Sequence, residues 1–86
     1  MVEKILKNAM RRGNTIFGFR RSMKFLKMNR GKMVIIAENM PEDMRKDIEY
    51  LCKISKIKVK IFKGSSKDLG IICGKPYPIT TVVIKG

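Results

Sequence analysis

Helices and strands are expected to alternate four times along the chain, which predicts an α/β fold with helices on both faces of a small sheet, a three-layer α/β/α sandwich. Apolar residues recur at three- and four-residue spacing in some segments, whereas other segments are short apolar runs or alternate between apolar and charged residues. Glycine and proline separate these segments. The 86 residues can form one core, so we expect a single domain over residues 1–86.

The first half of the chain contains two pairs of a helix and a strand. A helix is expected before Gly13, because five apolar residues share one helical face: Val2, Ile5, Leu6, Ala9 and Met10. Residues 15–17 are β-branched or aromatic and predict a short strand. A helical pattern then runs from residue 19 to Lys27 and stops before Gly31. Residues 32–37 form an almost continuous apolar run, which indicates a strand covered on both faces.

The second half repeats this alternation. A proline followed by two acids favours the start of a helix over residues 42–55. Residues 57–62 alternate apolar residues with lysines, which indicates a strand with at least one wet face. Residues 65–68 have the form of a capping box and predict a short helix that ends near Cys73. A loop restricted by two prolines then leads to a last strand over residues 79–84.

The charge points to a polyanionic partner. The chain has 20 Lys and Arg against seven Asp and Glu, a net charge of +13. A small basic domain attracts phosphate groups, so nucleic acid is the leading class of partner. An anionic membrane is the competing polyanion, but the apolar runs are far too short to span one, and no signal peptide is expected.

Catalytic and metal-binding chemistry is not expected. Histidine is absent, and no glycine motif of the phosphate-gripping kind occurs. Cys52 and Cys73 stand alone without metal-ligand spacing, which favours two buried thiols in a reducing, cytosolic compartment. Asp43 and Asp47 are one helical turn apart, but basic residues lie between them, which favours a solvated helix surface. We therefore expect no enzyme activity, no cofactor, no metal and no small-molecule substrate.

Two basic segments are candidates for contact with an anion. Arg20 and Arg21 follow Gly18 in the first turn of a predicted helix, where the dipole disfavours cations and favours an external anion. Lys24 and Lys27 continue the stripe that begins at Arg20; the alternative is a stripe that only keeps an exposed face soluble. A second basic run follows the third helix into the next strand, where it either attracts RNA at long range or protects a sheet edge: Lys53, Lys56, Lys58, Lys60 and Lys63.

Two loops are expected near the same edge of the sheet. If the strands that end near residues 17 and 37 are parallel, their carboxyl ends meet at the edge where open α/β sheets bind ligands. The loop at residues 38–40 follows one of these strands. The loop at residues 75–80 presents Tyr77 between two prolines, where the ring either stacks on an unpaired base or packs into the core.

Three stretches together resemble the L30e family of archaeal and eukaryotic large-subunit ribosomal proteins, part of the kink-turn RNA-binding superfamily that includes L7Ae. They read GNTIFGFRRSMKFLKMNRGKMVIIAENMP, DIEYLCKISKIKV and DLGIICGKPYPIT, and the resemblance runs from about Gly13 to Ile84. It implies a four-stranded mixed sheet within the three-layer sandwich. It also implies binding to an RNA kink-turn, a sharply bent internal loop with sheared G·A pairs, through the start of the second helix and two loops.

The resemblance assigns roles to individual residues. Gly18 would let the RNA approach the backbone, and Arg20 would read the G·A region, where the family has a lysine. Asn39 would bond base edges, Tyr77 is the aromatic loop residue, and Ile79 is its apolar neighbour against the bent RNA. Some departures matter. The L7Ae proteins have Asn-Glu in place of Arg20 and Arg21, which favours the L30e branch, although both groups share the lysine at Lys24. Some relatives have glycine in place of Thr80.

The sequence therefore predicts a cytoplasmic ribosomal protein of the large subunit that binds a kink-turn in rRNA, contacts other ribosomal components and is a monomer outside the ribosome. Glu38 either accepts a base amine or pairs with a nearby arginine. The alternatives are a free kink-turn subunit of a guide-RNA ribonucleoprotein and a small chromatin protein that binds duplex DNA by charge. The predicted RNA-binding residues are Gly18, Arg20, Arg21, Lys24, Glu38, Asn39, Tyr77, Ile79 and Thr80.

Overall fold

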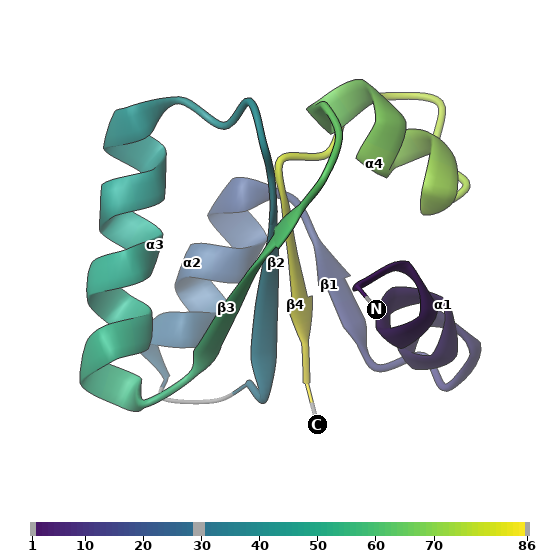
Figure 1. Cartoon of the computed structure of the whole chain (residues 1–86). Helices are drawn as coiled ribbons and strands as arrows, with labels where there is room; N and C mark the ends of the chain where they lie inside the picture. The colour runs from purple at the N-terminus through teal and green to yellow at the C-terminus, as the bar shows by residue number, and fades with distance from the viewer. Residues whose placement is uncertain (1, 29–30, 86) are drawn as a thin grey trace.

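The computed structural model describes residues 2–28 and 31–85, and its elements follow the predicted alternation (Figure 1). They are α1 Val2–Arg11, β1 Thr15–Phe17, α2 Phe19–Lys27, β2 Met33–Ala37, α3 Glu42–Ser55, β3 Lys58–Phe62, α4 Ser66–Ile72 and β4 Thr81–Ile84. The last strand begins at Thr81 instead of residue 79, because the two residues before it belong to the loop. The predicted stop of the second helix falls partly on residues 29–30, which lie outside the described residues.

The four strands form one mixed sheet in the order β1-β4-β2-β3. Strands β2 and β3 are parallel, and β4 is antiparallel to both of its neighbours, so β1, β2 and β3 all run the same way. Their carboxyl ends therefore lie at one edge of the sheet, together with the start of β4. This arrangement confirms the expectation that the strands ending near residues 17 and 37 open toward the same edge.

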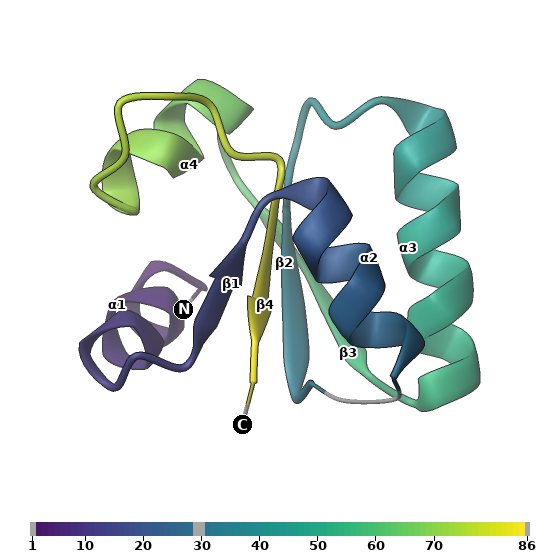
Figure 2. The same ribbon diagram turned by 180° about the vertical axis from the view of Figure 1, so that it is seen from behind.

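Helices cover both faces of the sheet, which confirms the three-layer α/β/α sandwich. Helices α2 and α3 lie on one face, and α1 and α4 on the other (Figures 1 and 2). The side chains of β2 alternate between two cores: Val34 and Ile36 pack with α2 and α3, whereas Ile35 and Ala37 pack with α1 and α4. Both cores are apolar, which explains why the β2 segment is an apolar run without alternation.

Local sequence signals fix several element ends. Helix α1 ends in a Schellman motif, in which Gly13 has a φ of 68° and the Asn14 N–H donates to the Ala9 carbonyl over 3.0 Å. Helix α4 begins with the predicted capping box, because Ser65 accepts from the Asp68 N–H and the Asp68 carboxylate accepts from the Ser65 N–H. No helix within residues 2–28 and 31–85 is long and apolar enough to cross a membrane.

Candidate nucleic-acid interface

The start of α2 presents unpaired backbone donors at the carboxyl edge of the sheet. Gly18, between β1 and α2, has a φ of 99°, a conformation that glycine adopts without strain. Its N–H donates to the Thr81 carbonyl over 2.9 Å, which ties the helix start to β4. No side chain caps α2, and a Cβ at Gly18 would meet nothing within 4 Å. The first-turn N–H groups and the helix dipole therefore favour an anionic group from outside the chain.

The loop at residues 75–80 meets this helix start in a hollow of about 560 Å³. Its lining comes from β1, the first turn of α2, α3 and the loop: Phe17, Gly18, Phe19, Arg20, Arg21, Met44, Lys75 and Tyr77. The fold thus brings together Gly18, Arg20, Arg21 and Tyr77, which the sequence predicted separately. Tyr77 is 52% exposed, so the alternative of ordinary core packing is wrong. An exposed ring beside two guanidinium groups is suited to stacking on an unpaired base while the cations hold phosphate.

Lys75 is a functional candidate that the sequence reasoning missed. It lines the same hollow, and its Nζ lies 5.1 Å from the centre of the Phe17 ring, within the range of a cation–π contact. The position of Lys75 directly before the Pro-Tyr-Pro segment is visible in the sequence. This position alone does not predict a role in binding, because only the fold shows that Lys75 turns back onto β1.

The arginines and Glu38 do not neutralise each other. Among residues 2–28 and 31–85, neither Arg20 nor Arg21 forms an ion pair, and Glu38 forms none either. The suggested pairing of Glu38 with an arginine is therefore absent from this structure. The backbone of Glu38 is held instead, because its N–H donates to the Gly64 carbonyl over 3.0 Å.

Asn39 has a definite orientation. Its side-chain Oδ1 accepts from the Ser66 N–H over 2.8 Å, at the first residue of α4. A backbone N–H can only donate, so this bond fixes the carbonyl side of the amide toward α4. The Nδ2 group has no partner within the described residues and belongs to an exposed side chain. Asn39 therefore offers donors to the outside, as expected of a residue that bonds acceptors on base edges.

Ile79 and Thr80 hold the loop in place. The Ile79 side chain is only 2% exposed and packs in the core under α1 and α4. In this structure the Ile79 side chain anchors the loop, and its contact with RNA stays a prediction. The Ile79 N–H donates to the Ser66 carbonyl over 3.0 Å, and the Thr80 carbonyl accepts from the Ala37 N–H over 2.9 Å. Thr80 itself is partly exposed.

The remaining predicted residues lie beside this hollow. Lys24 is exposed on α2 and shares a separate hollow of about 330 Å³ with Arg21, between α2 and β1. Glu38, Asn39 and Thr80 belong to the same sheet edge but line neither hollow. The candidate site is therefore a hollow lined by basic and aromatic side chains, with the turn at Asn39 and the exposed Lys24 beside it.

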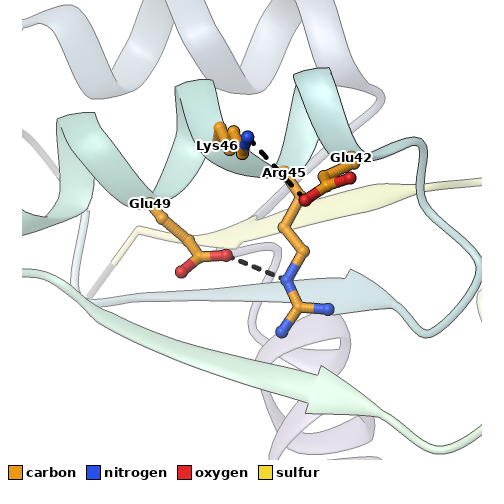
Figure 3. Close-up of polar contacts among 4 residues, drawn as sticks. All are labelled: Glu42, Arg45, Lys46 and Glu49. Atoms are coloured by element: carbon orange, nitrogen blue, oxygen red, sulfur yellow. Dashed lines mark hydrogen bonds and ion pairs between the residues drawn. The ribbon is translucent and has the colours of Figure 1, made fainter.

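The acidic residues of α3 are part of a solvated helix surface, as the sequence predicted. Arg45 Nε donates to Glu49 Oε1 over 2.9 Å, and Lys46 Nζ lies 3.7 Å from Glu42 Oε1 (Figure 3). Both pairs are spaced four residues apart on an exposed face and are worth a few tenths of a kcal/mol, about 0.3 to 0.5 each. No group of three potential metal ligands occurs among the described residues.

Comparison with known proteins places the chain in a family. A model described as the ribosomal protein L7Ae/L30e/S12e/Gadd45 family matches residues 1–86. The large ribosomal subunit protein eL30 of Methanothermobacter thermautotrophicus is 39% identical over 84 residues, which cover 98% of this chain and 86% of that protein. The eL30 protein of Saccharolobus solfataricus is 43% identical over 79 residues, which cover 92% of this chain and 73% of that protein.

Solved structures share the fold. A protein of unknown function from Bacillus halodurans superposes with a TM-score of 0.84 at 20% identity, covering 98% of this chain and 83% of that one. The Giardia lamblia 15.5kD RNA binding protein superposes with a TM-score of 0.81 at 17% identity, covering 99% and 71%. At these low identities the solved structures show only that the fold is shared. The match to the family model and the identity to the eL30 relatives show membership of the family. The chain belongs to the ribosomal protein L7Ae/L30e/S12e/Gadd45 family.

Proposed function

We propose that this chain is a ribosomal protein of the large subunit and binds a kink-turn in rRNA through the carboxyl edge of its sheet. One observation carries the proposal: the uncapped start of α2, two unpaired arginines and the exposed ring of Tyr77 meet in one hollow. The relatives named large ribosomal subunit protein eL30 support the assignment to the large subunit. The protein acts by binding and not by catalysis.

The chemistry of the edge divides into two kinds of contact. Arg20, Arg21 and the first-turn N–H groups of α2 hold backbone phosphate, with Lys24 next to them. Tyr77 covers an unstacked base, and the Nδ2 group of Asn39 donates to a base edge. A bent RNA brings phosphate and extruded bases to one place, whereas a straight duplex keeps its bases stacked inside. Shape, more than base sequence, therefore supplies the selectivity.

A binding comparison tests this proposal. The unmodified protein should bind a minimal kink-turn RNA more tightly than a plain RNA duplex or a DNA duplex of equal length in moderate salt. Arg20→Ala should weaken kink-turn binding by about 1 to 3 kcal/mol and duplex binding much less. Lys85→Ala is the matched control, because Lys85 is exposed at the opposite end of the strands. Equal affinity for kink-turn and duplex RNA would refute kink-turn recognition.

The cellular setting follows from the same proposal. The protein is expected in cytoplasmic ribosomes, in contact with rRNA and neighbouring ribosomal components, and as a monomer when free. Sucrose-gradient sedimentation of a cell extract should place it with large subunits. A position among small guide-RNA particles would support the free ribonucleoprotein alternative instead.

A further inference from the structure

A third hollow, of about 840 Å³, lies between α1 and the end of β3. Lys4, Lys7 and Arg11 of α1 line it together with Lys63, which follows β3, and Glu3 is the one acid in its lining. We call it the α1–β3 groove. It shares no residue with the hollow at the start of α2. Helix α1 also covers the opposite face of the sheet from α2 (Figures 1 and 2), so the two concave surfaces are separate.

The geometry of α1 aligns its cations. Lys4, Lys7 and Arg11 are spaced three and four residues apart, so they follow one side of the helix, and all three are exposed. The helix buries Leu6 and Ala9 against the sheet, which leaves this basic side free. Seven residues at about 1.5 Å each put Lys4 and Arg11 about 10 Å apart along the helix axis.

Strand β3 adds further positive charge on the same side. Side chains alternate along a strand, so Lys60 points to the same face as Phe62, and Phe62 packs in the core with α1. Lys60 and Lys63 are both exposed. Among residues 2–28 and 31–85, no ion pair involves Lys60, Lys63 or the three cations of α1. The positive field over the groove is therefore not neutralised by paired carboxylates.

We infer that the α1–β3 groove binds the phosphate backbone of a second RNA segment while the start of α2 holds the first. A nucleic-acid strand carries one negative charge per about 3.4 Å of helix axis, so cations spread over about 10 Å match neighbouring phosphates of one strand. Three lysines and one arginine line the groove beside Val2, Ile61 and Phe62, and no exposed aromatic ring is among the lining residues, which suits sequence-independent contact with a backbone through charge. The inference rests on the proposed function in one respect, namely that RNA is the polyanion this protein meets.

Two triple variants of equal charge test the inference. Lys4→Gln, Lys7→Gln and Arg11→Gln together remove three charges from the groove. Arg12→Gln, Lys32→Gln and Lys85→Gln together remove three charges from exposed positions at the end of the sheet away from the candidate site, and none of these residues lines the groove. Glutamine keeps a long side chain with good helix propensity, so both variants should fold. Each protein is first saturated with unlabelled minimal kink-turn RNA, and a labelled plain RNA duplex is then titrated at low and moderate salt.

The saturated unmodified protein should bind the labelled duplex. The groove variant should bind it at least about tenfold more weakly at low salt, and the slope of log affinity against log salt should fall by about 2 to 3. The control variant should change both quantities much less, and all three proteins should keep the same kink-turn affinity. Failure of the proposed function would appear separately, as a loss of kink-turn preference in the unmodified protein.

Three results would overturn the inference. Equal losses in the groove and control variants would assign the second binding event to net charge alone. Failure of the saturated protein to bind the duplex would show that the two surfaces are not independent. Binding of polyglutamate by the saturated protein as tightly as the duplex, at equal charge concentration, would make the groove a site for any polyanion and not for RNA.

Discussion

Asn39 has two chemically different ends, and the fold uses only one of them. Its Oδ1 accepts from the Ser66 N–H at the start of α4, while its Nδ2 group belongs to an exposed side chain with no partner among the described residues. The bond to α4 satisfies a backbone donor that the helix itself leaves unpaired. One side chain therefore fixes the relative position of two loops and offers donors to a ligand, and the two roles can be separated by mutation.

Asn39→Asp should lower kink-turn affinity by about 1 to 3 kcal/mol while leaving the melting temperature nearly unchanged. A carboxylate still accepts from the Ser66 N–H and is favoured at a helix start, but it has no group that donates to a base. Asn39→Ala should lose both roles, with about 1 kcal/mol of stability lost in addition. Fluorescence anisotropy measures the affinity, and circular dichroism follows the melting.

Glu38→Gln is the control for charge, because it removes a negative charge from the adjacent position and calibrates the purely electrostatic effect on RNA affinity. If Asn39→Asp binds the kink-turn as well as the unmodified protein after this correction, the amide does not read bases. Asn39 would then be a helix cap alone.

Both cysteines are buried, and burial makes their thiols unreactive because it disfavours the thiolate. Burial raises the pKa of Cys52 to about 11, with a smaller contribution from the negative charge of Glu49. Burial also raises the pKa of Cys73 to about 11, although Lys75 opposes the increase. The neutral thiol is therefore the favoured form of both cysteines, and the burial of both thiols agrees with the expectation from the sequence.

The rate of alkylation measures how far the two thiols are ionised and accessible. A pKa raised from the usual 9.0 to about 11 reduces the thiolate fraction at pH 8 by roughly a hundredfold, and the thiolate is the reactive form. Iodoacetamide should label both cysteines at least that much more slowly in the folded protein than in urea, as followed by mass spectrometry. Equal rates in the two conditions would show that Cys52 and Cys73 are open to solvent.

At the scale of elements, α4 positions the aromatic loop by direct backbone contact. A Cβ placed on Gly70 would lie 2.2 Å from the Tyr77 carbonyl oxygen and 3.4 Å from the Cα of Pro78. No side chain fits between the helix and the loop at this point. Glycine in the interior of a helix is unfavourable by about 1 kcal/mol relative to alanine, so its presence here needs the close approach of Tyr77 as its reason.

Gly70→Ala should therefore reduce both stability and RNA binding. The gain in helix propensity, about 1 kcal/mol, is smaller than the cost of displacing backbone, so we expect a net loss of about 1 to 3 kcal/mol in the free energy of unfolding. The displaced loop should move Tyr77 and weaken kink-turn binding more than duplex binding. Chemical denaturation and gel-shift titration provide the two measurements.

Ile71→Ala is the matched control, since Ile71 is a neighbour on the same helix with an exposed side chain. It should change neither quantity by more than about 0.5 kcal/mol. A Gly70→Ala protein that melts earlier but keeps full kink-turn selectivity would show that the RNA site does not depend on the position of this loop.

The helices and strands could be predicted because the sequence patterns that indicate them are local. Periodicity, glycines and the capping box indicated all eight elements, and the buried run at residues 32–37 indicated a central strand. The strand order was not predictable, because the insertion of β4 between β1 and β2 results from packing of distant segments. The start of β4 was misplaced for a similar reason: Ile79 has a strand-like sequence context, but its N–H bonds to Ser66 of α4.

The candidate site likewise contains residues that the local sequence predicts and residues that only the fold brings together. Arg20, Arg21 and Tyr77 were predicted from their places in a helix start and a proline-restricted loop, helped by the family resemblance. Lys75 and Gly70 were missed, because each acts through a segment that only the fold brings near. The hydrogen bond between Asn39 and the start of α4 joins residues 27 positions apart, and nothing in the local sequence predicts it. Burial of Ile79 likewise depends on how α4 packs.

At the scale of the molecule, the uneven distribution of charge matters more than its total. The net charge is +13, yet five of the seven acids lie between residues 38 and 49, most of them exposed on α3. The charged residues of α1, α2 and β3 are all basic, apart from Glu3. Ion pairs partly neutralise the acids of α3 (Figure 3), but Asp43 and Asp47 have no ion-pair partner within the described residues. We expect this surface to face away from RNA and to discourage binding in wrong orientations.

Asp47→Lys should therefore strengthen non-specific binding at the expense of selectivity. The substitution replaces a negative charge by a positive one and so raises the net charge of an exposed helix surface by two. Plain duplex RNA should therefore bind about two- to tenfold more tightly at low salt, with a steeper salt dependence. Kink-turn affinity should change less, because the proposed kink-turn site lies at the carboxyl edge of the sheet. Asp47→Ser removes the negative charge without adding a positive one, so its duplex affinity should fall between those of the unmodified protein and Asp47→Lys. Titration of both RNAs at several salt concentrations measures the ratio. If kink-turn affinity rises as much as duplex affinity, the α3 surface lies beside the bound RNA, and the acids of α3 do not orient the protein.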